Sequence, residues 1–128
     1  MKIHGKPLIG PNGAALPLSS AVETDGLVFV SGQLALVDGK VDGDITAQTE
    51  RTFDAISAIL GEAGLSLDNV VKATIWLTDP SDFADFNAVY AKRLPAPFPA
   101  RSCVVSQLVL PNARVEIEVV ASREPRRN

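Results

Sequence analysis

The spacing of hydrophobic residues along this chain alternates between helical and strand-like periods. Between residues 44 and 63 apolar side chains recur at steps of three and four, which predicts an amphipathic helix capped by Asp44 and ended by Gly64. A second stripe of this period begins after Asp79-Pro80 and stops at Pro95, which predicts another helix. Its apolar positions are Phe83, Phe86, Val89, Tyr90 and Leu94.

Four other segments are rich in apolar and β-branched residues, which predicts strands at 27–36, 70–78, 98–105 and 115–121. The order strand, helix, strand, helix, strand, strand predicts a two-layer α+β or α/β domain, with both helices on one face of a mixed sheet. Several strands are apolar beyond strict alternation, so the other sheet face is expected to be apolar and uncovered. Such a face predicts self-association.

The length of the chain and the composition of its two ends suggest one domain with loose termini. Residues 1–128 match the size of a single domain. Residues 1–16 contain closely spaced prolines and glycines, which predicts an extended arm with at most a short edge strand. Residues 122–128 include Arg123, Arg126 and Arg127 beside a proline, which is typical of a flexible, solvated tail.

Composition excludes several classes of function. Hydrophobic residues make up 46% of the chain and the formal net charge is -3, so it is globular but lacks the basic excess that favours nucleic acid as a principal partner. No apolar run is long enough for a signal peptide or a membrane span. One cysteine and one histidine cannot form a disulfide or a recognisable zinc set. The sequence therefore predicts a cytoplasmic protein without a metal.

Two of the predicted strands carry a charge that a buried strand does not tolerate without a partner, a ligand or water. Arg101 lies at the start of one run and Glu116 within the next, which makes both candidates for a site. If these strands form a hairpin with Val109 opposite Val115, the two charges are roughly 23 Å apart along the sheet. A single site using both residues would then need two copies of the chain.

Four short segments together carry a family resemblance. They are Ser31-Gly32-Gln33 after a hydrophobic strand, Asn87 in the second helix, the run Phe98-Pro99-Ala100-Arg101-Ser102-Cys103-Val104, and Val115-Glu116-Ile117-Glu118. In this combination the chain resembles the Rid (YjgF) family of enamine/imine deaminases, and in particular its RidA-like members. The resemblance extends over residues 17–121, which is most of the chain.

This resemblance implies a homotrimer of chorismate-mutase-like α+β fold with clefts between subunits. It also implies cofactor-free hydrolysis of 2-imino acids, formed from 2-aminoacrylate-type enamines, to 2-keto acids and ammonia. In such a cleft Arg101 would hold the substrate carboxylate, and Glu116 would activate or orient the attacking water. The cleft would be lined by the backbone of Cys103 and by Ser31, Gly32 and Asn87.

The residue types suit that chemistry. An arginine offers a planar fork to a carboxylate and keeps its charge throughout. A partly desolvated carboxylate can have a pKa high enough to take a proton from water and return it to departing ammonia. An imine is already electrophilic, so neither a metal nor a covalent nucleophile is required.

Leu18 departs from the family pattern, because many active members have a tyrosine thirteen residues before the serine that corresponds to Ser31. At this position the chain therefore lacks a phenolic hydroxyl that could bind substrate or water. Either water positioning rests on Glu116 alone, or Leu18 makes the pocket more apolar. We favour the second reading, which predicts a preference for imines with larger side chains.

Each candidate also has a purely structural reading. Arg101 could be an ion pair between subunits, Glu116 a solvated carboxylate, Cys103 a small apolar residue, and Ser31 and Asn87 ordinary hydrogen-bonding groups. Two other functions remain open: a pathway-specific deaminase of a larger enamine, and a trimer that binds 2-keto acids or acts like a chaperone without turnover. Family members have been linked to RNA cleavage, which the acidic balance disfavours.

Overall fold

The computed structural model describes residues 1–126, which form one six-stranded sheet, a small two-stranded sheet and two α-helices. The elements in chain order are β1 (Lys2–His4), β2 (Ala21–Thr24), β3 (Leu27–Gln33), β4 (Leu36–Val37), β5 (Lys40–Val41), α1 (Ile45–Glu62), β6 (Val70–Leu77), α2 (Phe83–Arg93), β7 (Ala100–Val105) and β8 (Val115–Ser122). Short 3₁₀ turns at Leu67–Asn69 and Pro80–Asp82 precede β6 and α2.

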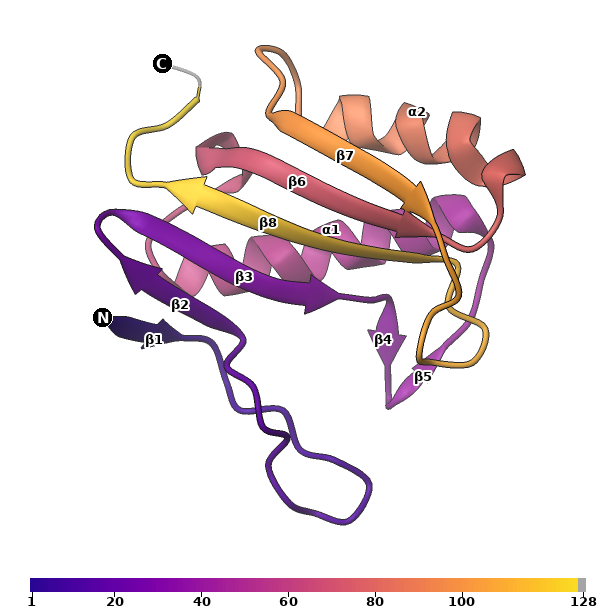
Figure 1. Ribbon diagram of the computed structural model, residues 1–128, viewed down its shortest axis with the longest axis horizontal. Coiled ribbons are helices and arrows are strands. Elements are labelled where there is room, and N and C mark those ends of the chain that lie inside the picture. Colours follow the sequence, from indigo (N-terminus) through magenta and orange to yellow (C-terminus); the bar gives the residue numbers. More distant parts are fainter. Residues whose placement is uncertain (127–128) are drawn as a thin grey trace.

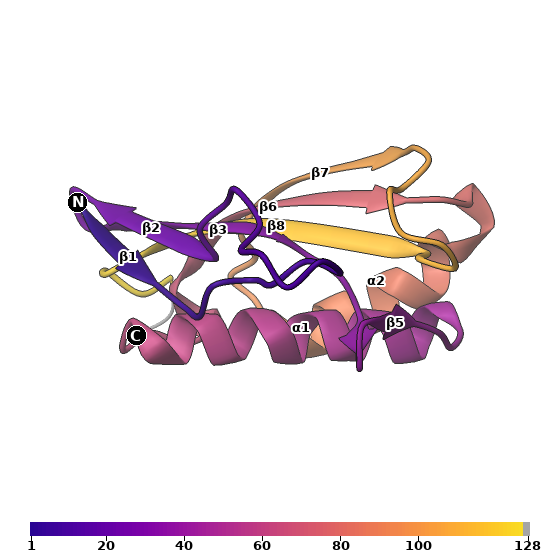
Figure 2. The same cartoon turned by 90° about the horizontal axis from the view of Figure 1, so that it is seen from below.

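The large sheet has the strand order β1-β2-β3-β8-β6-β7, in which only β6 and β7 are parallel (Figure 1). The helix α2 makes the crossover between these two parallel strands. Both helices lie on the same face of the sheet, and no described element covers the opposite face (Figure 2). The prediction of a mixed α+β sheet with two helices on one face is confirmed.

The core lies between the sheet and the helices, because alternate strand residues point toward α1 and α2. Along β8, Val115, Ile117, Val119 and Ala121 are buried. These side chains pack with Phe53 and the other buried residues of α1 and α2. Glu116 and Glu118, which fall between the buried positions, therefore lie on the face that no helix covers.

The predicted hairpin between the last two strands is wrong. The strand β8 pairs with β3 on one side and with β6 on the other, so β6 separates it from β7. The parallel crossover through α2 places β7 at the sheet edge, where it cannot also pair with β8. In the observed register Arg101 pairs with Ala73 of β6, and Glu116 pairs with Trp76 on the other side of β6. The two residues are therefore separated by three positions along the strand direction, roughly 10 Å.

The run predicted as a single strand at 27–36 is divided in the structure. The strand β3 ends at Gln33, after an irregularity in its pairing with β8, and Leu36 belongs to the small β4–β5 hairpin. The hydrophobic pattern continues across this break, although Leu36 and Val37 are exposed. Leu34 packs with Val41 and with the loop that contains Leu110, in a cluster outside the main core.

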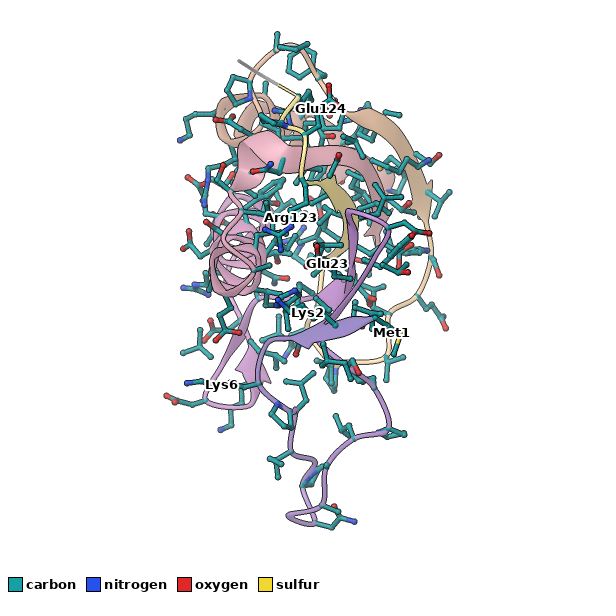
Figure 3. The ribbon with its side chains drawn as sticks, turned by 90° about the vertical axis from the view of Figure 1, so that its left-hand side faces the viewer. Met1, Lys2, Lys6, Glu23, Arg123 and Glu124 are labelled. Atoms are coloured by element: carbon teal, nitrogen blue, oxygen red, sulfur yellow. The ribbon has the colours of Figure 1, made fainter. Side chains whose placement is uncertain are left out.

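The arm contains the short edge strand that was expected, and two arginines of the tail contact the rest of the chain. The strand β1 pairs with β2. Arg123 donates two hydrogen bonds to the Glu23 carboxylate, at 2.7 and 2.8 Å (Figure 3). The Arg126 guanidinium donates to the carbonyls of Leu67, Val70, Pro95 and Pro97. Arg126 is therefore less solvated than predicted, whereas Arg123 remains exposed to solvent although it pairs with Glu23. Arg127 lies outside the described residues.

Candidate functional site

Arg101 is held at the sheet edge by α2, with its side chain on the helix-covered face. Its Nη1 atom donates a 2.7 Å hydrogen bond to Asn87 Oδ1. Its Cζ atom lies 4.8 Å from the ring centroid of Tyr90, 5.6 Å from that of Phe83 and 5.9 Å from that of Phe86. A cavity of about 320 Å³, here called the Arg101 pocket, is lined by Asn87, Tyr90, Ala91, Phe98, Pro99 and Arg101.

The helical period explains why these groups meet. Residues 83, 86, 87 and 90 lie three or four positions apart on α2, so their side chains share one face of the helix. The parallel register of β7 with β6 then places Arg101 above that face. Among residues 1–126, no carboxylate forms a salt bridge with Arg101. Its remaining guanidinium donors are therefore available to an external anion.

Cys103 lies two residues further along β7, on the same side of the strand as Arg101. It is half-buried and packs against the main core. Burial raises the pKa of the Cys103 thiol, and the nearby Arg101 charge opposes that effect only in part. The thiol therefore stays protonated near neutral pH, which favours the small apolar role over a nucleophilic one.

Glu116 lies on the uncovered face, against the end of β3. A Cβ atom added to Gly32 would lie only 2.1 Å from Glu116 Oε2, so the carboxylate occupies the space that the glycine leaves open. Burial raises the pKa of the Glu116 carboxyl, and repulsion from Glu118 raises it further. No basic side chain in the described part of the chain forms a salt bridge with Glu116.

Ser31 connects the end of β3 to the segment that contains Leu18. Its hydroxyl donates a 2.6 Å hydrogen bond to the Ser19 carbonyl, and its backbone N–H donates to the Ser20 carbonyl at 2.9 Å. Leu18 adjoins this contact in the chain and is 44% exposed. Ser31 and Gly32 thus join Glu116 in a second group of candidate residues, here called the Glu116 patch.

Within one copy of the chain, the structure brings the predicted residues together in two separate groups. Arg101, Asn87 and Cys103 gather on the helix-covered side at the β7 edge, whereas the Glu116 patch lies on the uncovered face. The sequence predicted from the hairpin that Arg101 and Glu116 of one copy lie too far apart to form one site. The hairpin is absent, but the two residues are still separated within one copy. The two side chains point to opposite faces of the sheet.

Sequence reasoning missed the aromatic surroundings of Arg101. It assigned Phe83, Phe86 and Tyr90 to the apolar stripe of the second helix, which is correct but incomplete. The available signal was the position of Asn87 within that stripe, since a polar residue flanked by aromatic residues at helical spacing marks where the helix meets something charged. The partner could not be read from the sequence, because it depends on the register of β7.

The fold and these two groups define an α+β protein with an unpaired arginine and an unpaired, half-buried carboxylate. The family model described as Endoribonuclease L-PSP matches residues 11–123. The chain therefore belongs to this family, which comprises the YjgF, RidA and RutC proteins. The resemblance that the sequence motifs indicated is confirmed.

Individual relatives agree with this assignment. Protein MMF1, mitochondrial, of Saccharomyces cerevisiae is 44% identical over 111 residues, which cover 84% of this chain and 76% of that protein. Reactive Intermediate Deaminase A, chloroplastic, of Arabidopsis thaliana is 41% identical over 109 residues, which cover 83% of this chain and 58% of that protein. The crystal structure of RidA from the Antarctic bacterium Psychrobacter sp. is 34% identical, with a TM-score of 0.83 over 95% of this chain and 99% of that one.

These names bear on the activity and the compartment to different degrees. A deaminase relative and a RidA structure support a family of imine or enamine deaminases, without identifying a substrate. Two of the relatives are mitochondrial or chloroplastic proteins, so the cytoplasmic setting of this chain stays a prediction. Over residues 1–126, no helix has both the length and the apolar character needed to cross a membrane.

Proposed function

We propose that this protein hydrolyses 2-imino acids to 2-keto acids and ammonia without a cofactor, in a homotrimer whose clefts lie between subunits. The observation that carries the proposal is the separation of an unpaired arginine and an unpaired carboxylate onto opposite faces of one sheet. Neither Arg101 nor Glu116 forms a salt bridge within the described chain. A second copy can place its Glu116 opposite the Arg101 of the first. Family membership supports the class of reaction.

A ring of subunits satisfies this geometry. Each copy would present its Arg101 pocket to one neighbour and its Glu116 patch to the other. Such a heterologous contact forms a closed ring of three when each copy is rotated by a third of a turn from the last. The uncovered face has apolar residues to bury in such a contact, including Phe29 and Val104, each 44% or more exposed. Three copies would produce three equivalent clefts.

In this cleft the substrate carboxylate accepts hydrogen bonds from the free N–H groups of the Arg101 guanidinium, while Nη1 donates to Asn87 Oδ1. Water then attacks C2 of the imine as Glu116 accepts a proton from it. Glu116 returns this proton to the nitrogen, which gives a neutral carbinolamine. A second transfer through the same carboxylate moves the hydroxyl proton to the nitrogen, and ammonia leaves as the C–N bond breaks and the carbonyl forms. The raised pKa of Glu116 makes it a better proton acceptor than an ordinary carboxylate, and the step consumes one water for each ammonia released.

The test generates 2-iminopropanoate with an amino-acid oxidase and follows its trapping by semicarbazide. We expect the wild-type protein to suppress trapping, and Arg101→Ala to lose both this effect and the binding of 2-oxobutanoate in calorimetry. Glu116→Gln should lose turnover but keep binding. Arg51→Ala, which removes a partly exposed arginine that pairs with Asp42 and belongs to neither group, is the matched control and should behave as the wild type.

Three results would contradict the proposal. Unchanged 2-oxobutanoate binding by Arg101→Ala would remove the carboxylate-clamp role, and full turnover by Glu116→Gln would remove the role of the base. Binding without any turnover, with imines of several sizes, would favour the non-catalytic trimer. Degradation of RNA at low salt without added metal would point instead to the activity in the family's name.

A second candidate function is deamination of a larger enamine that belongs to one pathway. The observation that favours it is the half-exposed Leu18 beside the Ser19–Ser31 contact, where the side chain offers apolar surface and no hydrogen bond. A pocket that includes Leu18 would bind a branched or extended side chain better than a methyl group. The residues of the Arg101 pocket and the Glu116 patch would keep the same roles.

A further inference from the structure

Arg101 is exposed at the sheet edge, yet aromatic rings rather than a carboxylate surround its guanidinium. Three rings from consecutive turns of α2 lie within 6 Å of its Cζ atom, and that of Tyr90 is the nearest at 4.8 Å. Asn87, between these rings in the sequence, accepts the hydrogen bond from Nη1. By contrast Arg93, one turn further along α2, forms salt bridges to Glu50 and Asp54, and its Cζ atom lies over a single ring, that of Phe53 on α1.

The difference between these two arginines has a chemical consequence. A carboxylate neutralises a guanidinium and occupies its donors, whereas an aromatic face attracts the positive charge through its quadrupole and leaves the N–H groups free. An amide oxygen likewise fixes the orientation of the guanidinium without neutralising it. The surroundings of Arg101 therefore restrict its movement while they preserve its charge for a ligand.

We propose that Tyr90 and Phe83 are positioning residues, whose rings hold the Arg101 guanidinium in the orientation that receives an anionic ligand. This inference rests on the proposed function, because it concerns how the same arginine binds a carboxylate. Binding then requires little further ordering of a long, flexible side chain, and the affinity for a small 2-keto or 2-imino acid is higher for that reason. Phe83 is not among the residues that line the Arg101 pocket, so its ring acts through Arg101, whereas the Tyr90 side chain also lines the pocket.

In Tyr90 the ring carries this role and the hydroxyl does not. The side chain is only 4% exposed, and its hydroxyl is the one buried side-chain polar atom in the described residues without a hydrogen-bond partner. Burial also raises the pKa of the Tyr90 phenol, so it remains neutral at physiological pH and adds no charge beside Arg101. Phenylalanine can therefore replace the part of Tyr90 that matters.

The experiment compares three variants by calorimetry with 2-oxobutanoate and by steady-state kinetics with imines generated in situ. Phe83→Leu and Tyr90→Leu each remove a ring, and we expect Kd and KM to rise about ten-fold with a much smaller change in kcat. Tyr90→Phe keeps the ring and should recover most of the affinity that Tyr90→Leu loses. The ¹⁵Nε resonance of Arg101, free of ligand, should shift in both leucine variants because a ring current is lost.

Phe83→Leu keeps the test informative if Tyr90→Leu unfolds, because Phe83 is 43% exposed and contributes little to the core. Wild-type Kd values in the leucine variants would overturn the inference, as would a loss in Tyr90→Phe as large as that in Tyr90→Leu. Arg101→Ala distinguishes a failure of the positioning role from a failure of the proposed function. If it abolishes binding while the ring variants bind normally, only the positioning role fails, whereas normal binding by Arg101→Ala defeats the proposed function as well.

Discussion

The contact between Gly32 and Glu116 provides the sharpest test of the proposed chemistry. In Gly32→Ala the new Cβ atom would lie 2.1 Å from Glu116 Oε2, while ordinary van der Waals contact begins near 3.4 Å. The carboxylate must therefore retreat by about 1.3 Å. Gly32 does not have the positive φ found at six other glycines of the described chain, so alanine causes no backbone strain of that kind.

The displacement should affect activity far more than stability. The atom in conflict is the end of a flexible side chain, which can rotate away at low energetic cost. A shift of about 1 Å in a group that activates water is sufficient to lower the rate about 100-fold. We therefore expect kcat/KM for 2-iminopropanoate to fall by about that factor, while the thermal midpoint and the Kd for 2-oxobutanoate stay near wild type.

The matched control is Gly61→Ala on α1, where an added Cβ atom meets nothing within 4 Å. This variant should keep full activity in the semicarbazide assay. If Gly32→Ala remains as active as Gly61→Ala, with the same oligomeric state by light scattering, the position of the Glu116 carboxylate is not critical and the reasoning is refuted. A collapse of stability in Gly32→Ala would show that the side chain cannot rotate as argued.

Three other predictions concern pH and specificity. Because the folded-state pKa of Glu116 is raised, its ionisation opposes folding as pH increases above the ordinary glutamate value, so Glu116→Gln should increase stability at pH 7 but not at pH 4, as measured by urea unfolding. Hydrogen bonds from Arg123, and then from His4, lower the pKa of Glu23 to about 2, so its contribution to stability is complete above pH 4.5 and disappears as pH falls toward 2. An NMR titration of the Glu23 carboxyl with an ordinary midpoint would contradict this. Leu18 should favour imines from leucine over those from alanine, and a clear preference for the smaller substrate in competition assays would exclude that role.

Local patterns in the sequence determined the helices, the class of fold and the candidate residues. The three- and four-residue spacing between 44 and 63 predicts α1 because a helix turns every 3.6 residues, whatever packs against it. The alternation in β8 assigns Glu116 and Ile117 to opposite faces for the same local reason. The motifs around Ser31, Arg101 and Glu116 identified the family, which the comparisons confirm.

Only the tertiary structure decided how these segments meet. β7 and β8 are neighbours in the chain, yet β6 lies between them, because strand order depends on which arrangement buries the most apolar surface under the two helices. The order of Arg126 depends on carbonyls from distant loops, and the aromatic surroundings of Arg101 depend on the parallel register of β7 with β6. A periodic pattern records how one segment faces its surroundings, whereas pairing between segments is a property of the whole packed chain.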